Sequence, residues 1–193
     1  MYKKVFIALG FCLVIVGLVG ITKASIMPIK AIIGQQYLQV AWKESLRANK
    51  LSKPWRSADF YMIGKLTVPK LKISRVILNS STGEAMAWGI GRVNNVQSSS
   101  GGSPIILAGH RDSHMQFMSK LKIGDKIELM MSDRLLKTYV ISKLKVNDKP
   151  ELKISYSSMG ENNLILTTCW PFNSSLQSSQ RYILIATRKD EMI

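Results

Sequence analysis

The stretch NLILTTCWPF, residues 163–172, contains a short apolar strand that ends at a cysteine. Its first residues are apolar or β-branched, which favours a strand, and Pro171 marks a turn directly after Cys169. The only other cysteine among the 193 residues is Cys12. The stretch therefore predicts a sheet that carries a solitary thiol at the end of one strand.

Segments of the same kind recur along most of the chain. Each is short, rich in β-branched or apolar residues, and bounded by Gly, Pro, Asn, Asp or Ser. Two short helical candidates, 82–90 and 113–121, interrupt the strands without alternating with them. This order favours a mostly antiparallel barrel or sandwich with small helices over a parallel doubly wound sheet. The predicted strands are 65–78, 103–110, 125–131, 136–146, 163–169 and 181–189, with a hairpin connection at 131–135.

The N-terminus predicts a membrane anchor over residues 1–23. Uncharged, mostly apolar residues run from Val5 to Thr22, between Lys3 and Lys4 on one side and Lys23 on the other. At about 1.5 Å per residue this run spans a hydrocarbon core of roughly 30 Å. A cleaved signal peptide is the alternative, although its apolar run is typically shorter. The lysines at the extreme N-terminus predict that this end stays in the cytoplasm and the rest lies outside the membrane.

Residues 24–53 predict an amphipathic linker helix. Pro54 marks the boundary to a single catalytic domain over residues 54–193, whose globular part begins near Phe60. We expect the linker helix to pack against the domain rather than bind a separate partner. The face expected to pack consists of Ile29, Ile32, Ile33, Tyr37, Val40 and Ala41.

The formal net charge of +15 raises the possibility of nucleic-acid binding. Without Lys3, Lys4 and Lys23, 24 basic and 12 acidic residues remain, which is a net charge of +12. The remaining lysines occupy the polar positions of alternating strands, as on solvated sheet faces. No nucleic-acid motif is present, and anionic lipid headgroups are a sufficient partner for such a surface. We therefore predict no nucleic-acid partner.

Chemically useful side chains stand at the ends of three predicted strands. His110 leaves the strand before it in ILAGHRDSH, Cys169 ends its own strand, and Arg181 opens the last strand while Arg188 lies near its close. In an antiparallel pairing of the last two strands, Arg181 rather than Arg188 would lie beside Cys169. Cys12 would lie in lipid, so we expect no disulfide with Cys169.

One cysteine, one histidine and one arginine can together form an acyl-transfer site. A positive charge nearby favours the thiolate, and an arginine can hold a developing oxyanion. A zinc set of His110, His114 and Cys169 is an alternative, but Gly109 and the preceding strand argue against a helix that would align the two histidines. A non-catalytic, membrane-tethered binding module with Cys169 as a core thiol is the other alternative.

The motifs AGHRD, LTTC and RY, in this order behind an N-terminal anchor, resemble those of the sortase family. The resemblance covers about residues 54–188, and its L-x-T-C signature falls on Leu166, Thr168 and Cys169. It implies a closed β-barrel, Cys169 as nucleophile, His110 and Arg181 as its partners, and no metal or organic cofactor. PWRSADF, VPKLKI and GHRDSHMQF more particularly resemble the sortases of Gram-negative marine bacteria. The interval from Cys169 to Arg181 is longer than in the best-known Gram-positive members and keeps Arg188 as a weaker candidate.

The resemblance implies a transpeptidase that takes an exported protein with a C-terminal sorting signal and passes it to an amine acceptor. In this interpretation the enzyme is a single-pass protein of the inner membrane with its catalytic domain in the periplasm. A cysteine peptidase that only hydrolyses is the nearest alternative. The L,D-transpeptidases also use cysteine and histidine, but their compact S-H-G-C type motif is absent here. The connection at 145–163, which would flank the substrate in sortases, offers no clear calcium cage.

Overall fold

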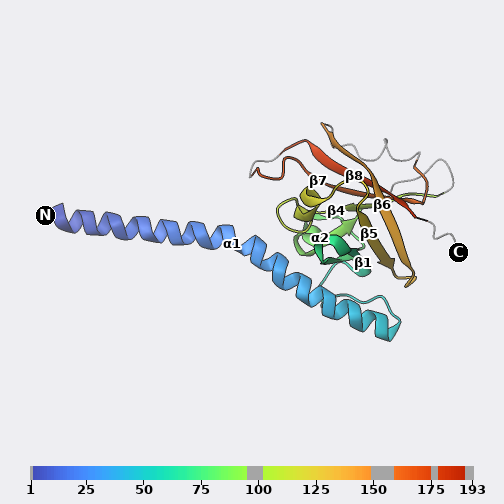
Figure 1. The fold of residues 1–193 in the computed structure, drawn as a ribbon. Helices are drawn as coiled ribbons and strands as arrows, with labels where there is room; N and C mark the ends of the chain where they lie inside the picture. The colour runs from blue at the N-terminus through green and yellow to red at the C-terminus, as the bar shows by residue number, and fades with distance from the viewer. Residues whose placement is uncertain (1, 95–101, 149–158, 175–177, 190–193) are drawn as a thin grey trace.

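The computed structural model describes residues 2–94, 102–148, 159–174 and 178–189. A closed β-barrel lies at one end of a long helix, and the first half of this helix projects away from the barrel (Figure 1). Around the barrel the strand order is β1-β2-β3-β4-β7-β8-β6-β5, and β5 pairs with β1 to close it. The elements are α1 (Tyr2–Ala48), β1 (Met62–Val68), the 3-10 helix η1 (Pro69–Leu71), β2 (Ile73–Leu78), α2 (Gly83–Trp88), β3 (Ile90–Arg92), β4 (Ile105–Ala108), the 3-10 helix η2 (Gln116–Lys120), β5 (Lys126–Met131), β6 (Leu136–Asn147), β7 (Asn163–Cys169) and β8 (Arg181–Arg188).

The structure confirms the predicted mainly β barrel with short helices. Most neighbouring strands are antiparallel, as expected, but β2 pairs with β3 and β4 pairs with β7 in parallel. The parallel pairing of β4 and β7 matters most for function, because both strands then end at the same edge of the barrel.

Two local predictions were wrong. The segment 65–78 is not one strand but a hairpin, because Pro69 begins a 3-10 turn and Lys72 adopts a left-handed conformation with φ of 53°. The predicted helix 82–90 ends at Trp88, and the next residues form the short strand β3. A strand of three residues is too short to show an alternating pattern in the sequence.

Strand alternation divides the apolar residues into an inner and an outer set. Along β7, Leu164 and Leu166 point into the barrel and belong to its main core, whereas Ile165 belongs to a separate cluster on the outer face. The outer cluster joins β4, β7 and β8 through Ile106, Ile165, Ile183 and Ile185. These three strands are therefore fixed by apolar packing on both faces.

The predicted anchor and linker helix are one continuous helix, α1, that runs from Tyr2 to Ala48. Its second half packs on the barrel through Leu38 and Trp42, which are almost fully buried. Gln35 Nε2 donates a hydrogen bond of 2.9 Å to the Trp88 carbonyl of α2. A Cβ atom at Gly34 would lie 2.5 Å from the Trp88 ring, so only glycine allows this close approach of α1 and α2.

The packing face predicted for the linker helix is wrong. Ile33, Tyr37 and Val40 are exposed to solvent, and Ala41 alone among the described members of that face lies against the packed cluster. The side chains of Ile29 and Ile32 lie outside the described residues. The helix carries apolar residues on two opposite faces, and the face with the larger Leu38 and Trp42 side chains is the one that packs.

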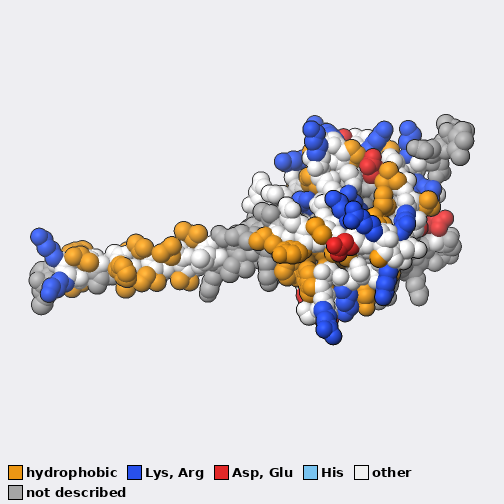
Figure 2. Space-filling view, turned by 90° about the horizontal axis from the view of Figure 1, so that it is seen from below, with side chains coloured by type: hydrophobic (Ala, Val, Ile, Leu, Met, Phe, Trp, Pro, Cys, Tyr) orange, Lys and Arg blue, Asp and Glu red, His pale blue; other side chains and the backbone are white. Residues whose placement is uncertain are grey.

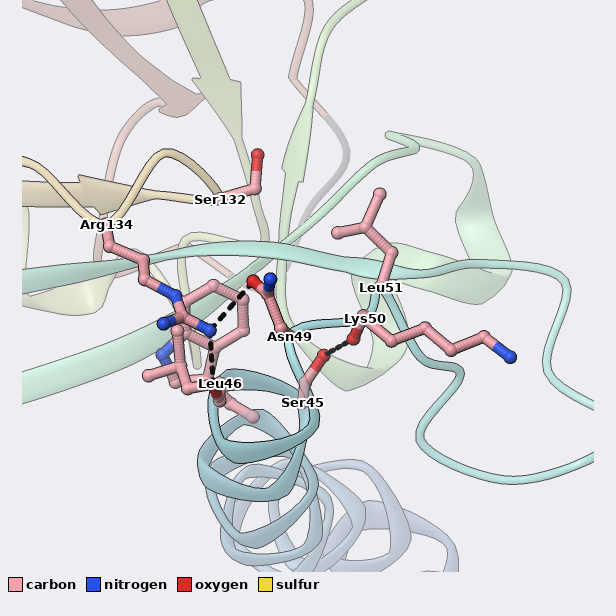
Figure 3. Close-up of a pocket in the computed structure, with 8 residues that line it drawn as sticks. Ser45, Leu46, Asn49, Lys50, Leu51, Ser132 and Arg134 are labelled. Carbon is pink, nitrogen blue, oxygen red and sulfur yellow. Dashed lines mark hydrogen bonds between the residues drawn. The ribbon is translucent and has the colours of Figure 1, made fainter.

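The C-terminal end of α1 is held by the β5–β6 hairpin. Arg134 Nη2 donates hydrogen bonds to the Leu46 carbonyl and to Asn49 Oδ1, as Figure 3 shows. Ser45 Oγ donates to the Lys50 carbonyl in the turn that follows the helix. These side chains border a cavity of about 90 Å³ that includes no residue of the predicted catalytic set.

Candidate active site

The end of β7 lies beside the start of β8. Cys169 is the register partner of Arg181, and both residues are half-buried. This confirms the strand pairing predicted from the sequence. Arg188 lies at the other end of the same pair, where its backbone N–H donates to the Asn162 carbonyl at 2.7 Å. Of the two arginines, only Arg181 is therefore a neighbour of the thiol.

The end of β4 lies on the other side of β7. The parallel register pairs Ala108 with Thr167, and Thr168 Oγ1 donates a buried hydrogen bond of 2.8 Å to the Gly109 carbonyl. His110 directly follows Gly109, and Cys169 directly follows Thr168. The two residues therefore lie at the same edge of the barrel. His110 is exposed to solvent, as a residue that exchanges protons with a substrate must be.

Gly109 lies in close contact with the turn that follows it. It is buried, and a Cβ atom there would lie 3.0 Å from Met115 Cγ. The Met115 N–H donates to the His110 carbonyl at 2.9 Å and turns the chain directly after the histidine. The positioning roles of Thr168 and Gly109 were not predicted from the sequence, although each residue directly precedes a predicted catalytic residue.

Arg181 is fixed by the connection that precedes it. Its Nη1 donates hydrogen bonds to the Ser178 carbonyl at 2.8 Å and to the Gln180 carbonyl at 3.0 Å. The Gln180 side chain in turn donates to Asp148 Oδ1 at 2.7 Å, beyond the end of β6. These bonds hold the guanidinium at the barrel edge that carries Cys169.

An aromatic cluster that the sequence analysis did not predict follows the cysteine. Trp170 stacks on Tyr182 with ring centroids 5.4 Å apart, and Phe172 meets both rings edge to face. Burial raises the pKa of Tyr182, so its hydroxyl stays neutral at physiological pH. The available signal in the sequence was the presence of aromatic residues directly after Cys169 and at the start of β8. The cluster stabilises the turn between Cys169 and Arg181.

His114 is buried, unlike His110. It is 2% exposed, and its Nε2 lies 3.3 Å from the Ala87 carbonyl. Burial, together with the nearby Arg75 charge, lowers the pKa of His114 to about 4 despite the bond to Ala87. The imidazole is therefore neutral at pH 7 and can donate to that carbonyl.

The alternative zinc set of His110, His114 and Cys169 is not assembled in the described residues. Within the described residues, no three histidine, cysteine, aspartate or glutamate side chains are close enough to hold a metal ion. His114 Nε2 instead lies against the Ala87 carbonyl. Most of the segment 145–163, including Glu151, lies outside the described residues.

The geometry brings His110, Cys169 and Arg181 to one edge of the barrel, at the ends of the adjacent strands β4, β7 and β8. Cys169 lies between the strand that leads to His110 and the strand that begins with Arg181. A thiol in this position can attack a carbonyl carbon while an imidazole handles protons and a guanidinium faces the oxygen. Binding alone needs no such combination of groups.

Comparison with known proteins identifies the fold and the family. The family model described as the sortase domain matches residues 66–189. The chain is 30% identical over 125 residues to sortase D of Bacillus subtilis, and the match covers 65% of this chain and 63% of that protein. A sortase D5 transpeptidase of Clostridium perfringens superposes with a TM-score of 0.60 at 18% identity, covering 81% of this chain and 99% of that one. Sortase A of Corynebacterium diphtheriae gives a TM-score of 0.58 at 16% identity, covering 82% and 85% of the two chains. The chain belongs to the sortase family.

Proposed function

We propose that this protein is a membrane-anchored cysteine transpeptidase that cleaves a C-terminal sorting signal of an exported protein and transfers the shortened protein to an amine acceptor. The observation that carries the proposal is the position of Cys169 between the end of β4 and the start of β8. Membership of the sortase family supports the same chemistry.

The proposed reaction has two halves. The Cys169 thiolate attacks a backbone carbonyl of the sorting signal, and Arg181 stabilises the oxyanion of the tetrahedral intermediate. The peptide C–N bond breaks, His110 gives its proton to the departing amine, and a thioester remains on Cys169. An acceptor amine then attacks the thioester, loses a proton to the neutral His110 imidazole, and releases the thiolate as the new amide forms.

The N-terminal half of α1 is the proposed anchor. Residues Lys3–Thr22 form a helix that is long and apolar enough to cross a membrane, and none of it is buried against the barrel. The flanking lysines favour an N-terminus in the cytoplasm and a catalytic domain on the outer side of the membrane. In a Gram-negative cell, which the resemblance of PWRSADF, VPKLKI and GHRDSHMQF suggests, that side is the periplasm. In this proposal residues 1–23 anchor the chain, 24–53 link it and 54–193 carry out catalysis.

The test is to trap the acyl-enzyme. Membranes that contain the full chain are incubated with an extract of exported proteins, and Cys169 peptides are analysed by mass spectrometry for a hydroxylamine-sensitive adduct. We expect a thioester to the new C-terminus of a cleaved protein, and no adduct on the Cys169→Ala variant. A wild-type chain that forms no adduct and leaves all exported proteins intact would refute the proposal.

The same experiment separates the alternatives. Addition of an amine such as triglycine should give a product extended by the amine. A product that ends in a free carboxylate at every amine concentration would identify a hydrolytic cysteine peptidase. A binding module would retain an exported protein without cleaving it and would be unaffected by Cys169→Ala.

A further inference from the structure

The second half of α1 carries an apolar stripe that nothing in the described structure covers. Ile33, Tyr37 and Val40, here named the outer stripe, are 51%, 66% and 59% exposed. Their spacing of four and three residues places them on one face of the helix. The opposite face, which includes Leu38 and Trp42, packs on the barrel. An exposed apolar stripe opposite the packed face is a candidate contact surface.

The outer stripe is visible as a surface feature. Figure 2, seen from below the view of Figure 1, shows hydrophobic side chains gathered where the helix runs under the barrel, with basic side chains around them. Lys43 and Arg47 are exposed on the turns that follow the stripe, and Glu44 is the acidic residue among them. An apolar centre with a tyrosine and a basic border is the composition of helices that lie in a membrane interface.

The same helix connects the outer stripe to the candidate membrane span. Ile33 lies about three turns after Thr22, the last residue of the span. Figure 1 shows that α1 bends between its two halves and that the barrel lies on the outer side of the bend. The sequence has a proline at position 28, and a proline inside a helix produces a kink. The face opposite the barrel is thus on the inner side of the bend, and a sharper bend at this point would bring that face, rather than the barrel, onto the membrane.

We propose that the outer stripe rests on the anionic surface of the membrane that the N-terminal half of α1 crosses. Ile33, Tyr37 and Val40 would enter the interface, while Lys43 and Arg47 meet lipid phosphates. The barrel, packed on the opposite face, would then be held at a fixed height above the lipid. This inference rests on the proposed membrane anchor but not on the proposed chemistry of Cys169.

The test measures the depth of three positions in the full chain. The protein is reconstituted in vesicles of phosphatidylethanolamine and phosphatidylglycerol, with one cysteine per variant labelled by an environment-sensitive fluorophore. The positions are native Cys12 in the span, Tyr37→Cys in the outer stripe and Ile123→Cys on the barrel, each with the other native cysteines replaced. Ile123 is the matched control because it is apolar and 65% exposed. Quenching by lipids that carry a spin label near the headgroup is compared among them.

We expect quenching at Tyr37→Cys to exceed that at Ile123→Cys several-fold and to be independent of the lipid-to-protein ratio. Equal quenching at these two positions, with Cys12 still deep in lipid, would overturn the inference and leave the anchor intact. If Cys12 were also outside the lipid, the anchor itself would be wrong. A label at Tyr37→Cys that becomes solvent-exposed on dilution with lipid would identify a second copy of the chain as the neighbour and would also overturn the inference.

Two further variants test the separate contributions of the apolar and the basic residues. With a fluorophore at Gln36→Cys, beside the stripe, the triple change of Ile33, Tyr37 and Val40 to serine should return the quenching to the barrel level. The control change Ile123→Ser should leave it unchanged. Replacement of phosphatidylglycerol by phosphatidylcholine should weaken the quenching, and an unchanged signal would refute the role of the anionic lipid.

Discussion

The two ends of the β7–β8 pair hold similar residues in different surroundings. At the connected end, Cys169 faces Arg181, and the Thr168–Gly109 bond attaches the end of β4. At the open end, Asn163 faces Thr187, and Arg188 follows without a cysteine or histidine beside it in the described structure. The β7–β8 pair thus has an arginine at each end, but only Arg181 shares its end with Cys169 and His110. In the proposed mechanism, the position of each arginine in the strand pair, and not its residue type, decides whether it takes part.

The histidines give the sharpest form of this comparison. His110→Ala should lower the second-order rate constant for transfer by about 10²–10⁴-fold, because the departing amine loses its proton donor. His114→Gln should keep most activity at low temperature, since a glutamine amide can still donate to the Ala87 carbonyl. The measurement is steady-state transfer of a fluorescent sorting peptide by folded protein. An inactive His114→Gln variant with unchanged secondary structure would contradict the separation of the two roles.

The arginines test the pairing of β7 with β8. Arg181→Ala should reduce the same rate constant by at least about a hundredfold, which is the usual cost of losing an oxyanion donor. Arg188→Ala, on the same strand at the other end, should change it less than about twofold because surface changes far from a site have small effects. A severe loss in Arg188→Ala with little loss in Arg181→Ala would show that the oxyanion role belongs to the other end of β8 and would contradict the assignment to Arg181.

The free energy of unfolding should depend on pH because of the buried His114. The pKa of His114 is about 4 in the folded protein and about 6.5 when unfolded, so the unfolded chain binds more protons between these values. Stability is therefore complete above about pH 6.5 and falls as the pH drops toward 4. Between pH 7 and pH 4.5 the loss should be about 2–3 kcal/mol. The checks are unfolding curves of the detergent-solubilised chain at both pH values.

His114→Gln should remove most of this pH dependence, and the matched control His110→Gln should retain it, because the dependence arises from the burial of the His114 ring. The same acid slope in all three proteins would show that other groups cause it. This pair of variants also distinguishes a stability effect from a catalytic one, since the proposed mechanism gives only His110 a part in the reaction.

The sequence predicted those features that depend on local patterns. Strand ends marked by Pro171 and by Gly109 placed Cys169 and His110 at barrel edges, and antiparallel geometry selected Arg181 over Arg188. The parallel neighbours β4 and β7 were not predicted, because their pairing depends on the closure of the whole barrel. The roles of the three side chains remain predictions that the proposed variants test.

The packing of α1 shows the limit of periodicity. Ile33, Tyr37 and Val40 repeat at helical spacing as regularly as Leu38 and Trp42 do. A periodic pattern identifies an apolar face but does not state which neighbour covers it. Only the tertiary structure shows that Gly34 and Gln35 adapt to α2 and select the face that packs.

The neighbouring threonines of β7 provide the smallest but most specific test. Thr168 Oγ1 donates to the Gly109 carbonyl, whereas the buried Thr167 Oγ1 has no hydrogen-bond partner among the described residues. Replacement by valine keeps the shape of both side chains. Thr168→Val should therefore lower the free energy of unfolding by about 1–2 kcal/mol, and Thr167→Val should leave it equal or raise it by up to about 1 kcal/mol.

Activity measurements on the Thr167 and Thr168 variants provide a second test. Loss of the Thr168 bond releases Gly109, the residue before His110. Thr168→Val should therefore lower kcat several-fold beyond what the smaller fraction of folded protein explains. Thr168→Ser should restore kcat. Thr167→Val should leave kcat unchanged if its hydroxyl only fills space. If Thr167→Val raised stability yet raised KM for the sorting peptide, the hydroxyl would be a substrate contact, because an unpaired buried donor is a cost that folding alone gives no reason to keep.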